Sequence, residues 1–163
     1  PCAIRYPKGT ACTDMEDCDE PLQKGRSEVI CRGSEIAIIG VGSMVAVCQK
    51  VCEGLRDDRI ARATFVNARF VKPLDTGLLD QLSKNHSLLV TVEENVKSGG
   101  FGEHVSAYME ACHPEVRVLS LAIRDHFIEH GTVDSQRVKT GLNVQGIVDA
   151  VEQSWADLAH NRK

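Results

Sequence analysis

Short apolar runs alternate with segments of helical periodicity along this chain from residue 34 onward. The apolar runs predict strands over 35–40, 61–67, 87–95 and 115–121. Helical spacing of apolar residues predicts helices over 43–56, 73–85, 101–113 and 144–160, and the irregular stretch 124–142 leaves room for one more short element. Strands that are apolar throughout are typical of parallel sheets covered on both faces. The pattern therefore predicts an α/β fold, a three-layer sandwich with a mostly parallel sheet of about five strands.

The same spacing makes predictions about single side chains. Asp75 stands where the second helix should begin and is expected to be its N-cap. Cys48 and Cys52 are four residues apart and should share a buried helix face. The side chain of Cys112 is expected on the buried face of the third helix. The chain has seven cysteines but no C-x-x-C pair, so they are interpreted as reduced thiols that pack as small hydrophobic groups. A metal or disulfide role is the less favoured alternative.

The first 33 residues follow no lasting period. They open with "AIRYPKG", become acidic in "TDMEDCDEP", and are interpreted as a surface connection that enters the domain. Since no initiator Met and no element-start signal precede them, we expect the chain to be cut from a longer protein.

Composition and charge exclude some classes of partner. The 163 residues are 42% hydrophobic and 26% charged, as in ordinary globular proteins. The net charge is −4 and no run of Lys or Arg forms a stripe, which argues against nucleic acid. The longest nearly uncharged run, residues 36–48, is shorter than the roughly 20 residues of a membrane span, so no membrane partner is expected.

A Gly-x-Gly follows the first predicted strand and raises the question of a dinucleotide site. Gly40 and Gly42 fit such a fingerprint, but Val45 stands where its third glycine should be. The next strand ends at Asn67, with no carboxylate to hold a ribose. We therefore interpret the glycines as a tight turn from strand to helix, with dinucleotide binding as the alternative.

Two glutamates end the third predicted strand, where α/β sheets usually place ligands. Glu93 and Glu94 come just before the glycines of "SGGFG". They are candidates for acid–base chemistry, for an interface anchor or for a partner of the next helix N-terminus. In "DHFIEHG", His126 and His130 are four apart, as two metal ligands on a helix would be, but the sequence offers no third ligand.

Arg5 follows a short apolar lead and precedes the turn signals of "YPKG". An arginine held at a strand end suits a phosphate or a carboxylate, because its planar fork donates two parallel hydrogen bonds. A structural ion pair is the alternative that the residues leave open.

Four segments, in this order and spacing, together resemble one family. "AIRYPKG", "NARFVKPLD", "LLVTVEENVKSGGFGEHV" and "DHFIEHG" are similar to the end of the 1-deoxy-D-xylulose-5-phosphate synthase family. Transketolases and 2-oxo acid dehydrogenase β subunits share the domain plan, but their sequences match these four segments less well. The chain departs from the family at Arg124, where a proline is usual, and in its number of cysteines.

The resemblance implies a thiamine-diphosphate-dependent transferase that joins pyruvate to glyceraldehyde 3-phosphate with loss of carbon dioxide. The product is a precursor for isoprenoid, thiamine and pyridoxal biosynthesis. It also implies that thiamine diphosphate and Mg²⁺ are held by domains outside this chain, and that the chain itself carries no cofactor, metal or catalytic residue. Arg5 matches the arginine that holds the acceptor phosphate, and Glu93 and Glu94 are expected to be interface or supporting groups.

The implied organisation has two parts. Residues 1–33 would be the end and linker of a pyrimidine-binding domain, and residues 34–163 a transketolase C-terminal-like α/β domain. The expected partners are the remaining domains of the synthase and a second copy in a homodimer. The fragment alone is expected to be inactive, and the location is a bacterial cytoplasm or a plastid stroma. A C-terminal module of a transketolase or of a 2-oxo acid dehydrogenase β subunit is the related alternative.

Overall fold

A five-stranded sheet forms the centre of the molecule. The computed structural model of the chain describes residues 21–57 and 63–161. The strands, in chain order, are β1 (Glu28–Cys31), β2 (Glu35–Gly40), β3 (Thr64–Asn67), β4 (His86–Val96) and β5 (Arg117–Ile123). They lie side by side in the order β1-β3-β2-β4-β5; β1 is antiparallel to β3, and every other pair is parallel. The predicted mostly parallel sheet is confirmed.

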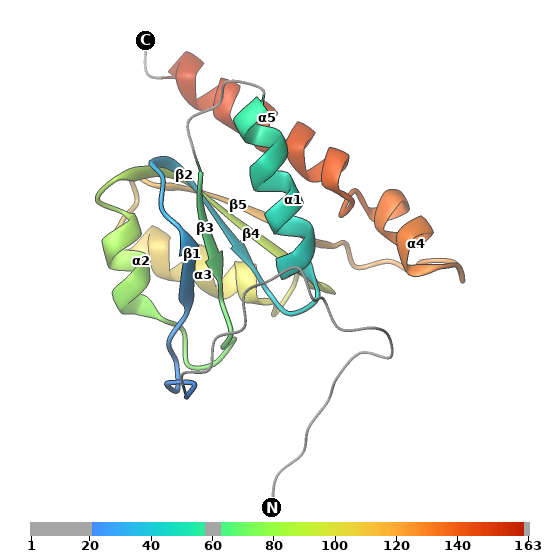
Figure 1. Ribbon diagram of the computed structural model, residues 1–163, viewed down its shortest axis with the longest axis horizontal. Coiled ribbons are helices and arrows are strands. Elements are labelled where there is room, and N and C mark those ends of the chain that lie inside the picture. Colours follow the sequence, from blue (N-terminus) through green and yellow to red (C-terminus); the bar gives the residue numbers. More distant parts are fainter. Residues whose placement is uncertain (1–20, 58–62, 162–163) are drawn as a thin grey trace, which may run out of the picture.

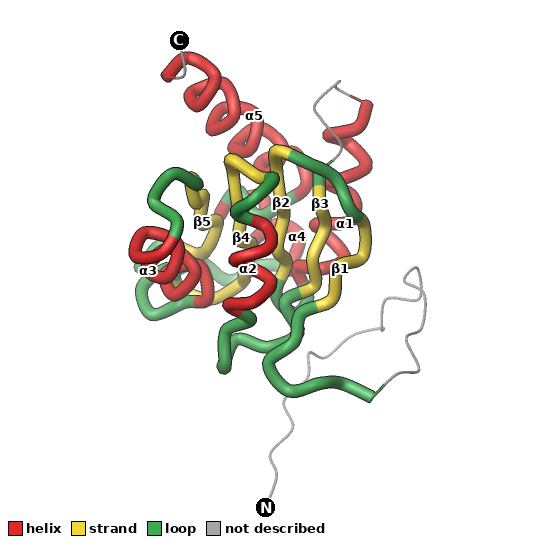
Figure 2. Tube along the Cα trace, turned by 90° about the vertical axis from the view of Figure 1, so that its left-hand side faces the viewer, coloured by secondary structure: helices red, strands yellow, loops and turns green. Residues whose placement is uncertain are grey.

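Helices cover both faces of the sheet. They are α1 (Met44–Asp57), α2 (Thr76–Leu82), α3 (Phe101–Cys112), α4 (Val133–Thr140) and α5 (Val144–Asn161). Figures 1 and 2 show α1 and α5 on one side of the sheet and α2 and α3 on the other. This arrangement confirms the three-layer α/β sandwich.

Strand alternation divides the core into two clusters. In β2, Ile36 and Ile38 pack with α1 and α5, whereas Ala37 and Ile39 pack with α2 and α3. All four side chains are 0–2% exposed. Since successive side chains of a strand point to opposite faces, a strand covered on both sides has to be apolar throughout. This explains the uninterrupted apolar run of "IAII".

Two side-chain predictions are confirmed and one is wrong. Asp75 is the N-cap of α2 and accepts a hydrogen bond from the Leu78 backbone N–H at 3.1 Å. Cys48 and Cys52 are both buried on α1, as predicted. Cys112 is exposed, because it lies in the last turn of α3, beyond the part of that helix that faces the sheet.

One element differs from the expectation, and another fills a place that the sequence pattern left open. Residues 28–31, which we expected to belong to a surface connection, form the edge strand β1. The room left for a short element is filled by α4, which Thr132 caps and which ends at Gly141 with φ +73°. No side chain of α4 is buried. This helix is therefore held to the sheet by contacts other than a hydrophobic core.

Within the described residues, no helix has the length and apolar character needed to cross a membrane.

Candidate functional site

The carboxyl ends of the parallel strands gather the polar groups that the sequence singled out. Glu93 and Glu94 lie near the end of β4, where its pairing with β5 shifts register between Val92 and Val96. Because the two residues are neighbours on a strand, their side chains point to opposite faces of the sheet. One carboxylate faces α3, and the other faces α1 and α4.

Glu93 is completely buried, and its carboxylate accepts hydrogen bonds from backbone N–H groups at the N-terminus of α3. Its Oε2 accepts hydrogen bonds from the Phe101 N–H at 2.9 Å and from the Asn95 side-chain amide at 3.1 Å. Its Oε1 accepts from the Gly102 N–H at 2.8 Å. A Cβ on Gly100 would stand 2.7 Å from Glu93 Oε1, so glycine is required there for the close approach. The carboxylate satisfies backbone donors that the helix start leaves without partners.

Glu94 joins α4 to the start of α1. Its Oε1 accepts a hydrogen bond from Arg137 Nε at 2.7 Å, and its Oε2 accepts one from the Ser43 hydroxyl. Burial disfavours ionisation of Glu94, but the hydrogen bonds from Arg137 and Ser43 and the Arg137 charge outweigh it and lower the pKa of this carboxyl. Glu94 is therefore an ionised group with its charge already paired.

The Gly-x-Gly forms the tight turn that we predicted. Gly42 adopts φ +58°, and a Cβ on Gly40 would stand 3.1 Å from the Cα of Val45. Ser43, at the end of this turn, donates to Glu94, so a carboxylate of the chain itself lies close to the α1 N-terminus. A dinucleotide phosphate would have to take this place. The glycines are explained by backbone geometry.

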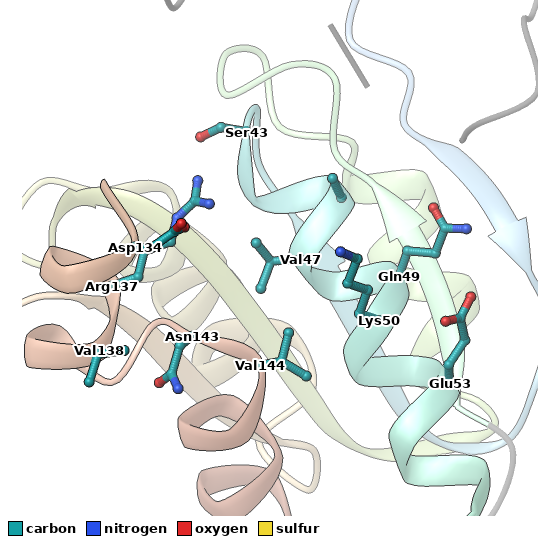
Figure 3. A pocket seen from close by; sticks show the side chains of 11 residues that line it. Ser43, Val47, Gln49, Lys50, Glu53, Asp134, Arg137, Val138, Asn143 and Val144 are labelled. Carbon is teal, nitrogen blue, oxygen red and sulfur yellow. The ribbon is translucent and has the colours of Figure 1, made fainter. Parts of the chain in front are cut away.

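A hollow of about 450 Å³ separates α1 from α4 and the start of α5. Figure 3 shows Val47 and Lys50 on the α1 side and Asp134, Arg137 and Val138 on the α4 side. We call it the α1–α4 hollow; Ser43, Ala46, Gln49, Glu53, Asn143 and Val144 complete its lining. A second hollow of about 260 Å³ lies between α4 and the end of β5, and Arg137 and Glu94 reach it.

The histidine pair does not form a metal site. Residues 124–132 are a loop, so the four-residue spacing of His126 and His130 does not place them on one helix face. Both side chains are exposed, as is Phe127 between them. Among residues 21–57 and 63–161, no three His, Cys, Asp or Glu side chains are placed to hold a metal ion.

Arg5 lies outside the described residues, so its expected phosphate contact stays a prediction. Cys48 is an inert thiol, since burial, with a smaller contribution from Cys52, raises its pKa far above the usual value.

Sequence reasoning missed Ser43, Lys50 and Arg137. Arg137 lies 43 residues from the carboxylate it binds, in a stretch without helical periodicity. One local signal was present: "HGTVDS" places Thr132 before an acidic first turn, as helix starts often do. This signal predicts helix α4, but it does not indicate that Arg137 binds Glu94.

The relatives of the chain fit this fold. The sequence model of the family described as "Transketolase, C-terminal domain" matches residues 25–147. The 1-deoxy-D-xylulose-5-phosphate synthase of Lachnoclostridium phytofermentans is 45% identical over 152 residues, which cover 93% of this chain and 24% of that protein. The synthase of Pseudoalteromonas translucida is 39% identical over 153 residues, with coverage of 93% and 24%. The chain thus spans about a quarter of the length of these relatives, and the resemblance carried by its motifs is confirmed.

Comparison with solved structures also finds transketolases. A split-gene transketolase, described as an inactive β4 tetramer, matches with a TM-score of 0.76 and 29% identity over 83% of this chain and 44% of that chain. The transketolase of Campylobacter jejuni matches with a TM-score of 0.62 over 85% of this chain and 20% of that chain; at 14% identity it shows the shared fold alone. This chain belongs to the transketolase C-terminal domain family.

Proposed function

We propose that this chain is the C-terminal domain of a thiamine-diphosphate-dependent synthase that condenses pyruvate with glyceraldehyde 3-phosphate to 1-deoxy-D-xylulose 5-phosphate. The observation that carries the proposal is the 45% identity with a synthase of that name over 93% of the chain. The product would feed isoprenoid, thiamine and pyridoxal biosynthesis.

In this proposal thiamine diphosphate and Mg²⁺ are bound by domains outside the chain. When bound there, thiamine diphosphate would supply the electron sink that decarboxylation of pyruvate needs. Support comes from the sheet edge, where the carboxylates of Glu93 and Glu94 are already engaged by α3, Ser43 and Arg137. No step of the reaction is therefore assigned to them.

The residues of the chain would contribute positioning. Arg5 would hold the acceptor aldehyde by its phosphate, which orients the carbonyl for attack. Glu93 and Glu94 would support the domain surface on which the neighbouring domain or a second subunit rests. Residues 1–33 would lead in from the pyrimidine-binding domain, and residues 34–163 would form the C-terminal domain of a homodimer in a bacterial cytoplasm.

Arg5→Ala in the full-length polypeptide tests the proposal. KM for glyceraldehyde 3-phosphate should rise roughly 10- to 100-fold, because a charge-assisted hydrogen bond contributes about 1.5–3 kcal/mol, while KM for pyruvate should not change. Arg32→Ala is the matched control, since Arg32 is an exposed arginine just after β1. Unchanged constants for both substrates would make Arg5 a structural residue.

The 163-residue chain alone should not decarboxylate pyruvate. Turnover by the purified chain with added thiamine diphosphate and Mg²⁺ would contradict the assignment of chemistry to other domains.

The match to a split-gene transketolase favours one alternative, a separate subunit that carries this domain. Reading the gene upstream of Pro1 separates the two plans. If the sequence upstream of Pro1 encodes a pyrimidine-binding domain within the same polypeptide, the synthase plan is supported. A start codon between the two domains supports the split subunit.

A further inference from the structure

A buried histidine lies at the amino edge of the sheet, opposite the edge that holds Glu93 and Glu94. His86 is the first residue of β4 and is only 7% exposed. Its ring Nδ1 lies 2.8 Å from the backbone oxygen of Leu82, at the end of α2, and its Nε2 lies 2.7 Å from the hydroxyl oxygen of Thr64 in β3. The imidazole therefore joins three elements of the fold.

These partners determine which ring nitrogen carries the proton. A backbone oxygen can only accept, so Nδ1 carries the hydrogen and donates it to Leu82. A neutral imidazole has one N–H, so Nε2 has a free lone pair and accepts from the Thr64 hydroxyl. The same hydroxyl oxygen accepts a hydrogen bond from the Gly33 N–H at 2.9 Å. One series of hydrogen bonds thus runs from Gly33, between β1 and β2, through the imidazole to α2.

Protonation of His86 breaks this series of hydrogen bonds at Thr64. The Thr64 oxygen would then face two N–H donors, and its own hydrogen would lose its acceptor. Thr64 is 2% exposed, and its hydroxyl has no other acceptor among residues 21–57 and 63–161. Because a buried donor without an acceptor is costly, opening of the site to water would relieve the mismatch.

The connection at the start of this series is strained. Residues 32–34 join β1 to β2, and Glu35, which follows them, adopts φ +69°, a left-handed conformation that is uncommon for residues other than glycine. Two hydrogen bonds hold the connection against the sheet: one joins Gly33 to Thr64, and the other joins the Glu35 N–H to the Asn85 oxygen at 2.9 Å. Loss of the first bond should let the connection open.

Among the described residues, three other titratable side chains line a polar hollow of about 500 Å³ together with His86. They are Glu35 of β2, Lys84 after α2 and Glu115 before β5. Burial lowers the pKa of His86 below its usual 6.5, and the bond to the Leu82 oxygen and the charge of Glu35 offset this only in part. The surroundings therefore favour the neutral ring that the hydrogen bonds require.

We propose that His86 is a pH-sensitive switch at the amino edge of the sheet. Its neutral ring holds the 32–34 connection closed through Thr64, and protonation of Nε2 opens that connection. The proposal does not depend on the proposed synthase activity.

The direction of the pH dependence follows from linkage. The pKa of His86 is lower in the closed state than its usual 6.5, so the opened or unfolded chain takes up this proton at a higher pH. The stabilising contribution of the neutral ring is therefore fully present above pH 6.5 and is lost as the pH falls through the pKa of the closed state.

NMR of the ¹⁵N-labelled full chain tests the position of the proton. At about pH 7.5 the His86 ring should have a protonated Nδ1 and an unprotonated Nε2, and its titration midpoint should lie below 6.5. An Nε2–H tautomer, or a midpoint at or above 6.5, overturns the proposal.

Hydrogen exchange measures the opening itself. The opening constant of the Gly33 amide, corrected for the intrinsic exchange rate, should rise about fivefold between pH 7 and pH 5.5, since one proton permits at most about tenfold per pH unit. The Ile147 amide of α5, which donates to the Asn143 oxygen at 3.0 Å, is the internal reference and should not change. Equal changes at both amides would show general loosening in acid and overturn the proposal.

Two variants complete the test. His86→Gln keeps an acceptor for the Thr64 hydroxyl but cannot take up a proton, so the pH dependence at Gly33 should disappear. His126→Gln removes an exposed histidine from the 124–132 loop, and this matched control should keep the rise at Gly33. A rise that survives His86→Gln overturns the proposal. If His86→Gln does not fold, the tautomer and the Gly33 exchange of the unmodified chain still decide.

Discussion

Two adjacent carboxylates at the end of β4 have opposite surroundings. Glu93 is 0% exposed and accepts two backbone hydrogen bonds at the start of α3, a helix with four buried residues. The Glu94 side chain is 33% exposed and binds Arg137 of α4, a helix with no buried residue. One glutamate is part of the core, and the other joins two surface elements.

The difference follows from the geometry of a strand. Neighbouring side chains point to opposite faces, so a single step along β4 moves a carboxylate from the α2–α3 layer to the α1–α4 side. A buried carboxylate costs stability unless hydrogen bonds compensate for its lost hydration, whereas a partly exposed ion pair contributes little either way. The same side chain should therefore have very different energetic weight at the two positions.

The largest effect should come from Glu93→Gln. The amide cannot accept from both the Phe101 and the Gly102 N–H groups, because its amino group would face one of these donors. We expect the free energy of unfolding to fall by about 3 kcal/mol, since hydrogen bonds to a charged group contribute about 1.5–3 kcal/mol each. Urea unfolding measures this change, and a loss below about 1 kcal/mol would contradict the comparison.

Gly102→Ala tests the same helix by size instead of charge. The added Cβ would stand 2.5 Å from Thr91 Oγ1 and closer still to Ser120 Oγ, on two neighbouring strands. Overpacking of this kind costs about 1–3 kcal/mol, so the Tm should fall.

Gly54→Ala in α1 is the matched control for this substitution. There the nearest atom to the new Cβ is Val148 Cγ2, at 3.8 Å. Alanine should stabilise that helix by up to about 1 kcal/mol. Equal effects at the two glycines would refute the close packing of α3 on the sheet.

Glu94→Gln should have a small global effect and a clear local one. Loss of a partly exposed ion pair costs about 1 kcal/mol or less. Because α4 has no buried side chain to hold it, its amide protons should exchange faster in this variant, while those of α3 should not change. Hydrogen exchange by mass spectrometry resolves the two helices, and equal protection of α4 in both proteins would show that other contacts hold it.

The smallest expected effect is on the pH dependence of the free energy of unfolding. The pKa of Glu94 is lowered from its usual 4.5, with Arg137 and Ser43 as the stabilising partners. The unfolded chain therefore binds this proton at a higher pH than the folded chain does. The contribution of the ion pair is fully present above pH 4.5 and is lost as the pH falls through the folded pKa. Carboxyl ¹³C NMR should give a midpoint below 4.5 that rises in Arg137→Gln; a midpoint at or above 4.5 in the unmodified protein would contradict the pairing.

The central elements of the fold were predictable because their local pattern and their burial agree. β2 and β4 are apolar throughout since both faces are covered, and α1, α3 and α5 repeat apolar residues at helical spacing. Edge strand β1 has no such pattern: its four residues are only partly buried or exposed, and pairing with β3 defines it. Cys112 fitted the helical period, but the period does not show where a helix extends past the sheet.

The site was predictable only in part, for a similar reason. The end of β4 was a clear candidate because ligands and polar groups gather at that edge of α/β sheets. Which glutamate faces α3 and which meets Arg137 depends on the register shift of β4 against β5 and on a contact across 43 residues. Neither feature leaves a mark in a single sequence.

The most direct test of the account is kcat of the full-length polypeptide with Glu94→Gln, measured for synthesis from pyruvate and glyceraldehyde 3-phosphate. This carboxylate is bound by Arg137 and Ser43, and we propose that the chemistry lies in other domains, so kcat should stay within about twofold of the unmodified protein. A general acid or base contributes roughly 10²–10⁴-fold to rate. A fall of that size in a variant that remains folded would make Glu94 a catalytic residue and contradict the account.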